Sequence, residues 1–325
     1  MERVESFSFH AGCCGNTKQT DDMKVAPNDH ECAYDPIEIF CYTRDTFILR
    51  TSKCLHYEGN FLYLLFGDNT VLLHDTSALD KDALPLPQIV ENLICFVHSN
   101  ESLSEQAFHT KFHDSSMSRQ FLNESVKPEE RQKELLVVHS HCHSDHIAGD
   151  SGFYEKQRTT AVPTGLKEMK QFYGFTEDET QRYVDLGGRS LEVLWTPGHE
   201  PNRTDICFYD NKHKFVLTGD LLYPGRLYIS NFQDFRESIH KLWVFSQNHD
   251  ISAYLGSHIE IGTEGKRKVE YPCGTRYQPH EHPLTLSSKD LSDLYQFLNG
   301  TENPVTELNG RVIFDSFILH PNNIC

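Results

Sequence analysis

The chain has 325 residues, which is enough for one domain of about 250 residues with appendages. Its formal net charge is −17 and no basic run offsets it, so nucleic acid and anionic membrane surfaces are disfavoured as partners and a small-molecule substrate is favoured. Residues 1–12 lack the apolar segment of a secretory signal, and no run is long enough to span a membrane. We therefore expect a cytoplasmic protein whose ten cysteines are free thiols.

The first half of the chain predicts a leader, a strand-rich region and an insertion. Residues 1–34 are polar and show no periodicity, which is typical of a flexible leader, and residues 35–325 predict a single domain. Residues 99–134, rich in Ser, Glu, Lys and Gln, predict a partly helical surface insertion. Apolar patterning predicts antiparallel strand pairs at Ile37–Tyr42 with Thr46–Arg50 and at Phe61–Phe66 with Val71–His74, and then a helix at Leu86–Val97.

The second half predicts alternating strands and helices and a short C-terminal extension after residue 258. The Phe232–Phe245 helix carries an apolar stripe that favours burial in the core. The other predicted elements are strands at Thr159–Val162, Leu191–Thr196, Ile206–Tyr209, Phe215–Leu217, Ile251–Leu255 and Val312–Leu319, and helices at Leu166–Tyr173 and Asp290–Leu298.

One block of the sequence indicates a metal site. The β-branched run Leu135–Val138 predicts a buried strand, and His141, His143, Asp145 and His146 follow it within a few residues. Alternation along an extended chain sends His141 and His143 the same way, so their imidazoles can bind one metal ion. Asp145 and His146 lie just beyond, where the chain must turn, and can bind a second ion. A solvated loop has no physical need for this cluster.

Three later strand ends each carry one further candidate ligand. His199 closes the turn Thr-Pro-Gly-His, Asp220 follows a glycine, and His258 follows Gly-Ser. Each of these is a weak signal alone, since aspartate after glycine is common in turns and a histidine at a strand end is usually a surface residue. Together with the first block they strongly indicate a metal centre.

The motifs HSHCHSDH, TPGH, TGD and GSH, in this order, resemble the signature of the metallo-β-lactamase-fold hydrolase superfamily, in its glyoxalase II and lactonase-like branch. The resemblance covers about residues 37–258 and implies an α/β fold, a four-layer αβ/βα sandwich with the metal site at one edge. It implies that His141, His143 and His199 bind the first metal, that Asp145, His146 and His258 bind the second, and that Asp220 bridges the two.

The same resemblance gives expectations for neighbouring residues. Asp75 is expected to support the metal site from behind, and Ser77 stands where the family usually has glycine. Asp220 stands where the best-known β-lactamases have a cysteine ligand, which argues against β-lactamase activity.

This ligand set predicts a binuclear hydrolase. Histidine and carboxylate ligands suit two Zn²⁺ ions, with Fe or Mn also tolerated. Two ions about 3.5–4 Å apart can share a hydroxide, which then attacks a small ester, thioester or lactone. Asp145 is also a candidate for relaying the proton. Tyr223 or Tyr228 is a candidate donor to the developing oxyanion, although packed aromatic residues in a loop are an equally good interpretation.

Other functions remain open. Persulfide dioxygenases have the same fold and use one iron at the positions of His141, His143 and His199, and a phosphodiesterase or a non-catalytic binding protein is also compatible with the motifs. The tail after residue 258 is shorter than the thioester-binding domain of glyoxalase II, which weakens a glutathione-thioester assignment.

Overall fold

The computed structural model describes residues 35–113, 132–264, 267–300, 306–308 and 311–320. The predicted leader, residues 1–34, and residues 114–131 of the predicted insertion lie outside this part of the chain. The described start of the insertion is helical, as predicted, since it contains a helix at Glu105–His113.

The first sheet has six strands in sequence order. Neighbours among the first four strands are antiparallel, which confirms both predicted strand pairs, and the last two strands join in parallel. Strand β3 is buried on both faces, which explains why its sequence is continuously apolar. The strands are β1 Ile37–Thr43, β2 Thr46–Thr51, β3 Phe61–Phe66, β4 Thr70–His74, β5 Glu134–Val138 and β6 Thr159–Ala161.

The second sheet also has six strands, in the order β15-β12-β10-β9-β8-β7. Strands β7 to β10 form an antiparallel meander, and β12 pairs in parallel with β10. Its strands are β7 Gln181–Asp185, β8 Ser190–Trp195, β9 Ile206–Asp210, β10 Phe215–Gly219, β12 Ala253–Gly256 and β15 Thr285–Leu286.

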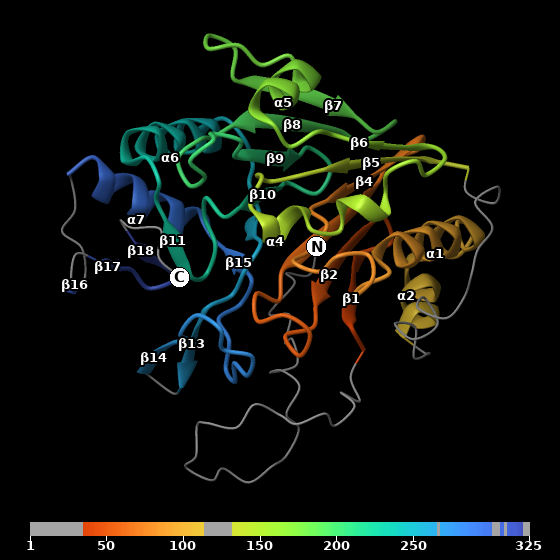
Figure 1. Ribbon diagram of the computed structural model, residues 1–325, viewed down its shortest axis with the longest axis horizontal. Coiled ribbons are helices and arrows are strands. Elements are labelled where there is room, and N and C mark those ends of the chain that lie inside the picture. Colours follow the sequence, from red (N-terminus) through yellow and green to blue (C-terminus); the bar gives the residue numbers. More distant parts are fainter. Residues whose placement is uncertain (1–34, 114–131, 265–266, 301–305, 309–310, 321–325) are drawn as a thin grey trace, which may run out of the picture.

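Helices cover the outer faces of both sheets (Figure 1). α1 Leu86–Ser99 and α2 Glu105–His113 cover the first sheet, and α6 Phe232–Gln247 and α7 Ser288–Leu298 cover the second. Alternation in β3 shows why the layers form: Tyr63 packs between the two sheets, whereas Leu62 and Leu64 pack on the α1 side. The four layers confirm the expected αβ/βα sandwich. Among the described helices, none combines the length and the apolar composition needed to cross a bilayer.

Three short helical elements lie beside this sandwich. α5 covers Leu166–Tyr173, as predicted, and contributes Met169 and Tyr173 to the core between the sheets. α4 Ser144–Ile147 and the single 3-10 turn η2 Asp150–Gly152 directly follow the predicted metal-binding block.

The C-terminal part differs from the prediction. The expected strand Val312–Leu319 is instead two strands joined by a turn, in which the Phe314 N–H donates to the Phe317 carbonyl at 2.9 Å. The turn contains Asp315 and Ser316, two good turn formers that the apolar neighbours masked. The sheet order is β11-β18-β17-β16, and the strands are β11 Arg226–Tyr228, β16 Thr306–Leu308, β17 Arg311–Ile313 and β18 Ile318–His320; β13 Ile261–Glu264 and β14 Arg267–Glu270 form a separate hairpin.

The prediction of free thiols is wrong at two positions. Cys54 and Cys273 are disulfide-bonded, whereas Cys41, Cys95, Cys142 and Cys207 are free. Pairing depends on which loops meet in the fold, and composition does not contain that information. Disulfides persist in oxidising compartments, so these two residues count against the cytoplasmic location expected from the sequence.

Candidate metal centre

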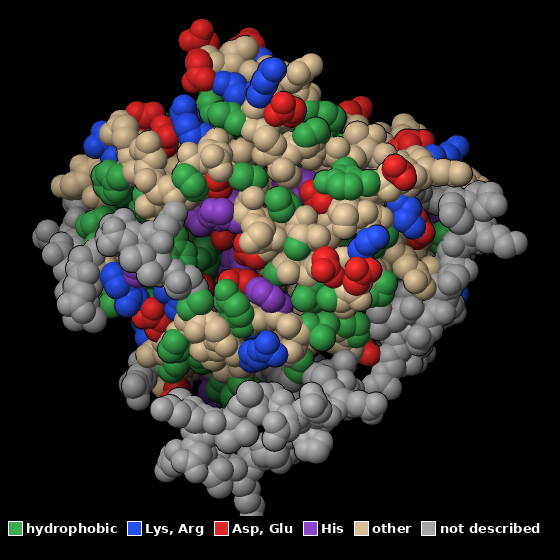
Figure 2. All heavy atoms as spheres, viewed as in Figure 1, with side chains coloured by type: hydrophobic (Ala, Val, Ile, Leu, Met, Phe, Trp, Pro, Cys, Tyr) green, Lys and Arg blue, Asp and Glu red, His purple; other side chains and the backbone are tan. Residues whose placement is uncertain are grey.

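Four strand ends meet at one edge of the sandwich and bring the seven predicted ligands together. They are the carboxyl ends of β5, β8, β10 and β12. Backbone bonds join their loops: the Ile206 N–H donates to the Ser140 carbonyl at 2.8 Å, and the Ser257 N–H donates to the Gly219 carbonyl at 3.1 Å. Figure 2 shows histidine and carboxylate side chains gathered in a hollow near the middle of one face.

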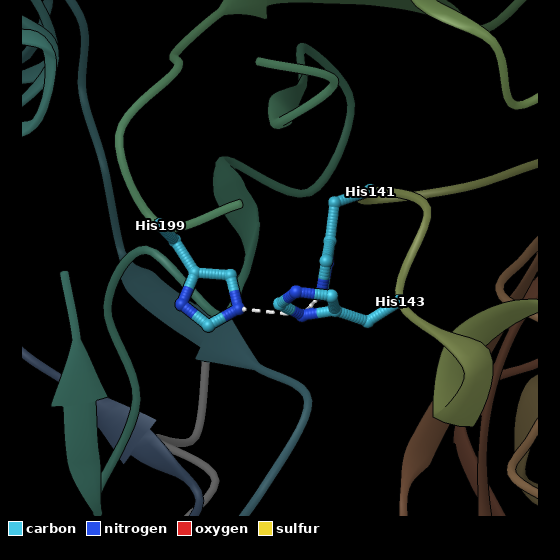
Figure 3. Close-up of side chains that lie close together, drawn as sticks. All are labelled: His141, His143 and His199. Carbon is cyan, nitrogen blue, oxygen red and sulfur yellow. Dashed lines mark hydrogen bonds between the residues drawn. The ribbon is translucent and has the colours of Figure 1, made fainter. Parts of the chain in front are cut away.

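His141, His143 and His199 form the first ligand group. His141 and His143 come from the loop after β5, and His199 reaches them from the loop after β8 (Figure 3). The Nδ1 atom of His143 lies 2.9 Å from Nε2 of His141 and 3.1 Å from Nε2 of His199. Ligand atoms around a tetrahedral zinc ion, with bonds of 2.0–2.1 Å, are about 3.3 Å apart. The three nitrogen atoms therefore suit one ion.

Asp145, His146 and His258 form the second ligand group. The Oδ2 atom of Asp145 lies 3.2 Å from Nε2 of His146 and 3.4 Å from Nε2 of His258, and the two imidazole nitrogens are 3.4 Å apart. The one-turn helix α4 brings Asp145 and His146 to this position, which is the turn expected after the strand.

Asp220 lies between the two groups. Its Oδ2 atom is 3.6 Å from Nε2 of both His146 and His199, and its Oδ1 atom is 3.4 Å from Nε2 of His258. Oδ1 is buried and accepts no hydrogen bond. Its contact with His258 is an ion pair when that ring is protonated, and a divalent ion between the two would replace the proton. The donor set, with this carboxylate buried between the two groups, fits a divalent ion in each group.

Buried partners orient the histidines. The Oδ2 atom of Asp75 lies 2.9 Å from Nδ1 of His146, and Oδ1 accepts the Ser140 N–H at 2.7 Å. Nδ1 of His199 lies 2.9 Å from the Tyr228 carbonyl oxygen. These contacts point Nε2 of each ring toward the site. Asp75 thus lies behind the ligands, at the place where the sequence predicts a supporting carboxylate.

The local backbone explains why positions 198 and 219 are glycine, and it shows how Ser77 is accommodated where the family usually has glycine. A Cβ atom on Gly198 would lie 2.4 Å from the backbone of Phe235, and one on Gly219 would lie 2.5 Å from Cβ of Ser140. Ser77, which replaces the expected glycine, has a φ of 83°, in the region that favours glycine. Its Oγ accepts the Leu79 N–H at 3.1 Å, which helps to hold this conformation.

The pKa values of four of the histidines are shifted, in opposite directions in the two ligand groups. Burial lowers the pKa of His141 and of His199, so these imidazoles are neutral and able to bind metal. Burial would also lower the pKa of His146 and His258, but Asp145 and Asp220 outweigh it and raise both pKa values well above 6.5. Metal binding at the second group must therefore displace protons.

The two predicted tyrosines differ in what their hydroxyl groups do. Tyr223 is buried beside His258, and its hydroxyl donates to the Arg226 carbonyl with a Glu260 oxygen 3.1 Å away. Tyr228 is half-buried, and its hydroxyl oxygen accepts the Arg226 Nε–H at 2.9 Å. The Tyr228 proton is therefore available to a ligand, whereas the Tyr223 proton is already used within the protein.

Sequence reasoning missed three residues around the centre. The Asp205 carboxylate accepts the Gly198 and Glu200 N–H groups, each at 3.1 Å, and so holds the turn that presents His199. Glu58 and Asn60 lie beside the second ligand group. Asn60 is 85 residues from Asp145 in the chain, so no local sequence pattern could have revealed the contact.

Part of the chain matches the model of one protein family. Residues 119–249 match the family model described as the Metallo-beta-lactamase superfamily. The acyl-coenzyme A thioesterase MBLAC2 of Gallus gallus is 30% identical over 160 residues, which are 39% of this chain and 57% of the relative. A hydroxyacylglutathione hydrolase of Francisella philomiragia subsp. philomiragia is 28% identical over 110 residues, which are 31% of this chain and 38% of the relative.

A third relative has a different activity. The mitochondrial persulfide dioxygenase ETHE1 of Bos taurus is 32% identical over 91 residues, which are 27% of this chain and 33% of the relative. The chain therefore spans between one third and 57% of the length of these three relatives.

Proposed function

We propose that this protein, whose residues 119–249 match the Metallo-beta-lactamase superfamily model, is a binuclear metal-dependent hydrolase of small thioesters. The observation that carries the proposal is Asp220, whose two oxygens face both ligand groups. A single-ion enzyme would not need the complete second group. Two of the relatives are named as hydrolases of thioesters, which favours this substrate class over oxygen esters and lactones.

Each residue would have a defined part in holding the ions. His141, His143 and His199 would hold the first, Asp145, His146 and His258 the second, and Asp220 both. Nitrogen and carboxylate ligands favour zinc. When bound, the ions supply an activated water at neutral pH and polarise the oxygen of the scissile bond.

Asp145 is proposed to move the proton. Its side chain is 23% exposed, against 8% for Asp220, so of these two ligand carboxylates it is the more open to solvent. Neighbouring His146 and His258 outweigh burial and hold the pKa of Asp145 well below its usual range, so it carries a proton only in passing. As water adds to the carbonyl carbon and the carbon–sulfur bond breaks, Asp145 would pass the proton of the water to the departing thiolate.

Tyr228 is proposed to bind the substrate carbonyl oxygen. Arg226 occupies its acceptor side, and the Tyr228 backbone carbonyl lies against Nδ1 of His199, so the residue is anchored beside the first ligand group. Its remaining O–H can donate to the oxygen on which negative charge develops.

A substrate panel with metal control tests the proposal. The protein is stripped with a chelator, reloaded with Zn²⁺, and assayed with an acyl thioester, the matching oxygen ester, a lactone and a phosphodiester. We expect the thioester to have the highest kcat/KM, activity to disappear on stripping, and Zn²⁺ to restore it. An absence of hydrolysis across the panel by zinc-loaded protein would contradict the proposal.

A persulfide dioxygenase is the second candidate. It is favoured by the similarity to ETHE1, and the three nitrogens of the first ligand group could hold one ion alone. Iron in the purified protein, together with oxygen consumption on addition of a persulfide, would select this function over hydrolysis.

A further inference from the structure

The loop of residues 52–60, which joins β2 to β3 and is here called the second-site loop, reaches the second ligand group with two side chains. The Asn60 Nδ2 donates to Oδ2 of Asp145 at 3.3 Å. The Glu58 Oε2 lies 3.6 Å from Nδ1 of His258, and the Glu58 carbonyl oxygen lies 3.5 Å from the same nitrogen. In the described chain, the contacts of Glu58 and Asn60 with metal-ligand candidates involve only Asp145 and His258.

We propose that Glu58 and Asn60 are positioning residues for the second metal ion, and that the second-site loop sets the affinity of this ion without affecting the first. The proposal rests on the two-metal function proposed above. Both Glu58 oxygens lie at Nδ1 of His258, opposite the metal-facing Nε2: the backbone carbonyl is within hydrogen-bond distance and orients the ring, and the nearby carboxylate raises its basicity as a ligand. Asn60 fixes the carboxylate plane of Asp145.

The loop is held in a preformed shape. The Lys53 side chain is only 6% exposed, and its Nζ donates to the carbonyl oxygens of Tyr57 at 2.9 Å and Glu58 at 3.3 Å. Arg276 donates to the Cys54 carbonyl at 2.7 Å, and the Cys54 sulfur is in a disulfide. These contacts pin the backbone before and at Glu58, and the Thr51 N–H donates to the Asn60 carbonyl at 3.0 Å after it. The carboxylate is therefore presented to His258 at little further cost in conformational entropy.

A substitution at Asn60 can distinguish a positioning role from a structural one. It is fully buried, yet its Oδ1 accepts no hydrogen bond. A buried unsatisfied oxygen weakens a fold, so the amide is poorly explained by stability and well explained by its donor to Asp145. Asn60→Leu keeps the shape and removes both the donor and the orphaned oxygen. It should therefore leave the stability of the metal-free protein unchanged or higher while weakening the second metal site.

Zinc titration of the full chain tests the proposal. Wild-type protein and the variants Asn60→Leu, Glu58→Gln and Glu264→Gln are stripped of metal and titrated with Zn²⁺ against a chromophoric chelator, and the melting temperature of each metal-free protein is recorded. Glu264→Gln is the matched control, because it removes an exposed carboxylate at the end of β13. We expect the second Zn²⁺ to bind about 10–100-fold more weakly in Asn60→Leu and Glu58→Gln, with the first unchanged.

The outcomes separate the two proposals. Wild-type affinity for both ions in Asn60→Leu and Glu58→Gln, or an equal loss of both ions, would overturn the role of the loop while leaving the metal centre intact. Wild-type protein that binds one Zn²⁺ per chain would overturn both the loop proposal and the binuclear function. Loss of the second ion together with a lower melting temperature of metal-free Asn60→Leu would show a structural role and also overturn the proposal.

Discussion

The two ligand groups are supported in different ways. The first group lies on loops tied to the ends of the sandwich strands, and its His199 is oriented by a backbone carbonyl, that of Tyr228. The second group depends more on side chains: Asp75 orients His146 and Asn60 contacts Asp145, although His258 lies against both the carboxylate and the backbone carbonyl of Glu58. A backbone carbonyl remains under any substitution, whereas a side-chain partner can be lost by one. We therefore expect the first site to be robust and the second to be adjustable.

The histidines of the two ligand groups also differ in the direction of their pKa shifts. The histidines His141 and His199 have lowered pKa values through burial, while carboxylates raise those of His146 and His258. Protons therefore compete with metal at His146 and His258 and hardly at His141 and His199.

The largest effect should come from removing the residue that belongs to both groups. Asp220→Asn keeps the shape but takes away the negative charge that faces His146, His199 and His258. Loss of ion stabilisation worth several kcal/mol corresponds to at least about a 10³-fold fall in kcat/KM for the preferred substrate. Steady-state kinetics measures this, and circular dichroism checks that the variant is folded. Activity within tenfold of wild type would show that Asp220 does not join the two sites.

The next largest effect is expected from substitution of Tyr228, and substitution of Tyr223 should differ from it. Tyr228→Phe removes the proposed oxyanion donor and the acceptor of the Arg226 Nε–H, so it should lower kcat by about 10²-fold and also cost about 1 kcal/mol of stability. Tyr223→Phe removes a hydroxyl that is bonded within the protein, so it should cost about 1 kcal/mol of stability with kcat nearly unchanged. Steady-state kinetics and thermal melts of both variants measure these changes in kcat and stability. The reverse pattern would move the oxyanion donor to Tyr223.

Acidification should separate the two sites. Metal binding requires neutral imidazoles, and the pKa values of His146 and His258 are raised above 6.5, so a fall from pH 8 to pH 6 adds protons to the second group first. Second-site affinity should fall about tenfold per pH unit for each proton displaced, and more steeply than first-site affinity, because the pKa values of His141 and His199 are lowered. Zinc titrations at several pH values measure both. A parallel fall at both sites would contradict the division.

The smallest effect on metal binding should follow loss of the Cys54 disulfide in the second-site loop. Cys54→Ser removes one disulfide, but Lys53 and Arg276 still hold the second-site loop. We expect the second ion to bind less than about tenfold more weakly and the first ion to be unaffected. Cys95→Ser, which removes a cysteine outside the disulfides, is the control for zinc titration. A larger loss at the first site than at the second would show that the tie serves the whole fold.

The fold could be predicted from the sequence to a large extent because its core strands have strong, local patterns. The apolar runs of β3, β5 and β10 and the stripe of α6 follow from burial, and four strand ends carrying His and Asp were enough to predict where the ligand side chains gather. Whether all seven bind metal stays a prediction.

What the sequence did not reveal depends on contacts between distant loops. The positions of Glu58 and Asn60, the disulfide bonds of Cys54 and Cys273, and the hydrogen bond from Arg226 to the Tyr228 hydroxyl all depend on tertiary contacts. The turn between β17 and β18 was missed for the opposite reason, because apolar residues on both sides hid a local signal.

Metal content tests the central claim most directly. The full chain is purified without added metal, and zinc, iron and manganese per chain are measured by elemental analysis. The account predicts about two zinc ions per chain, one for each ligand group joined by Asp220. About one iron per chain and no zinc would contradict it and favour the dioxygenase. A protein that contains no metal and takes none up on addition would remove the basis for any metal-dependent function.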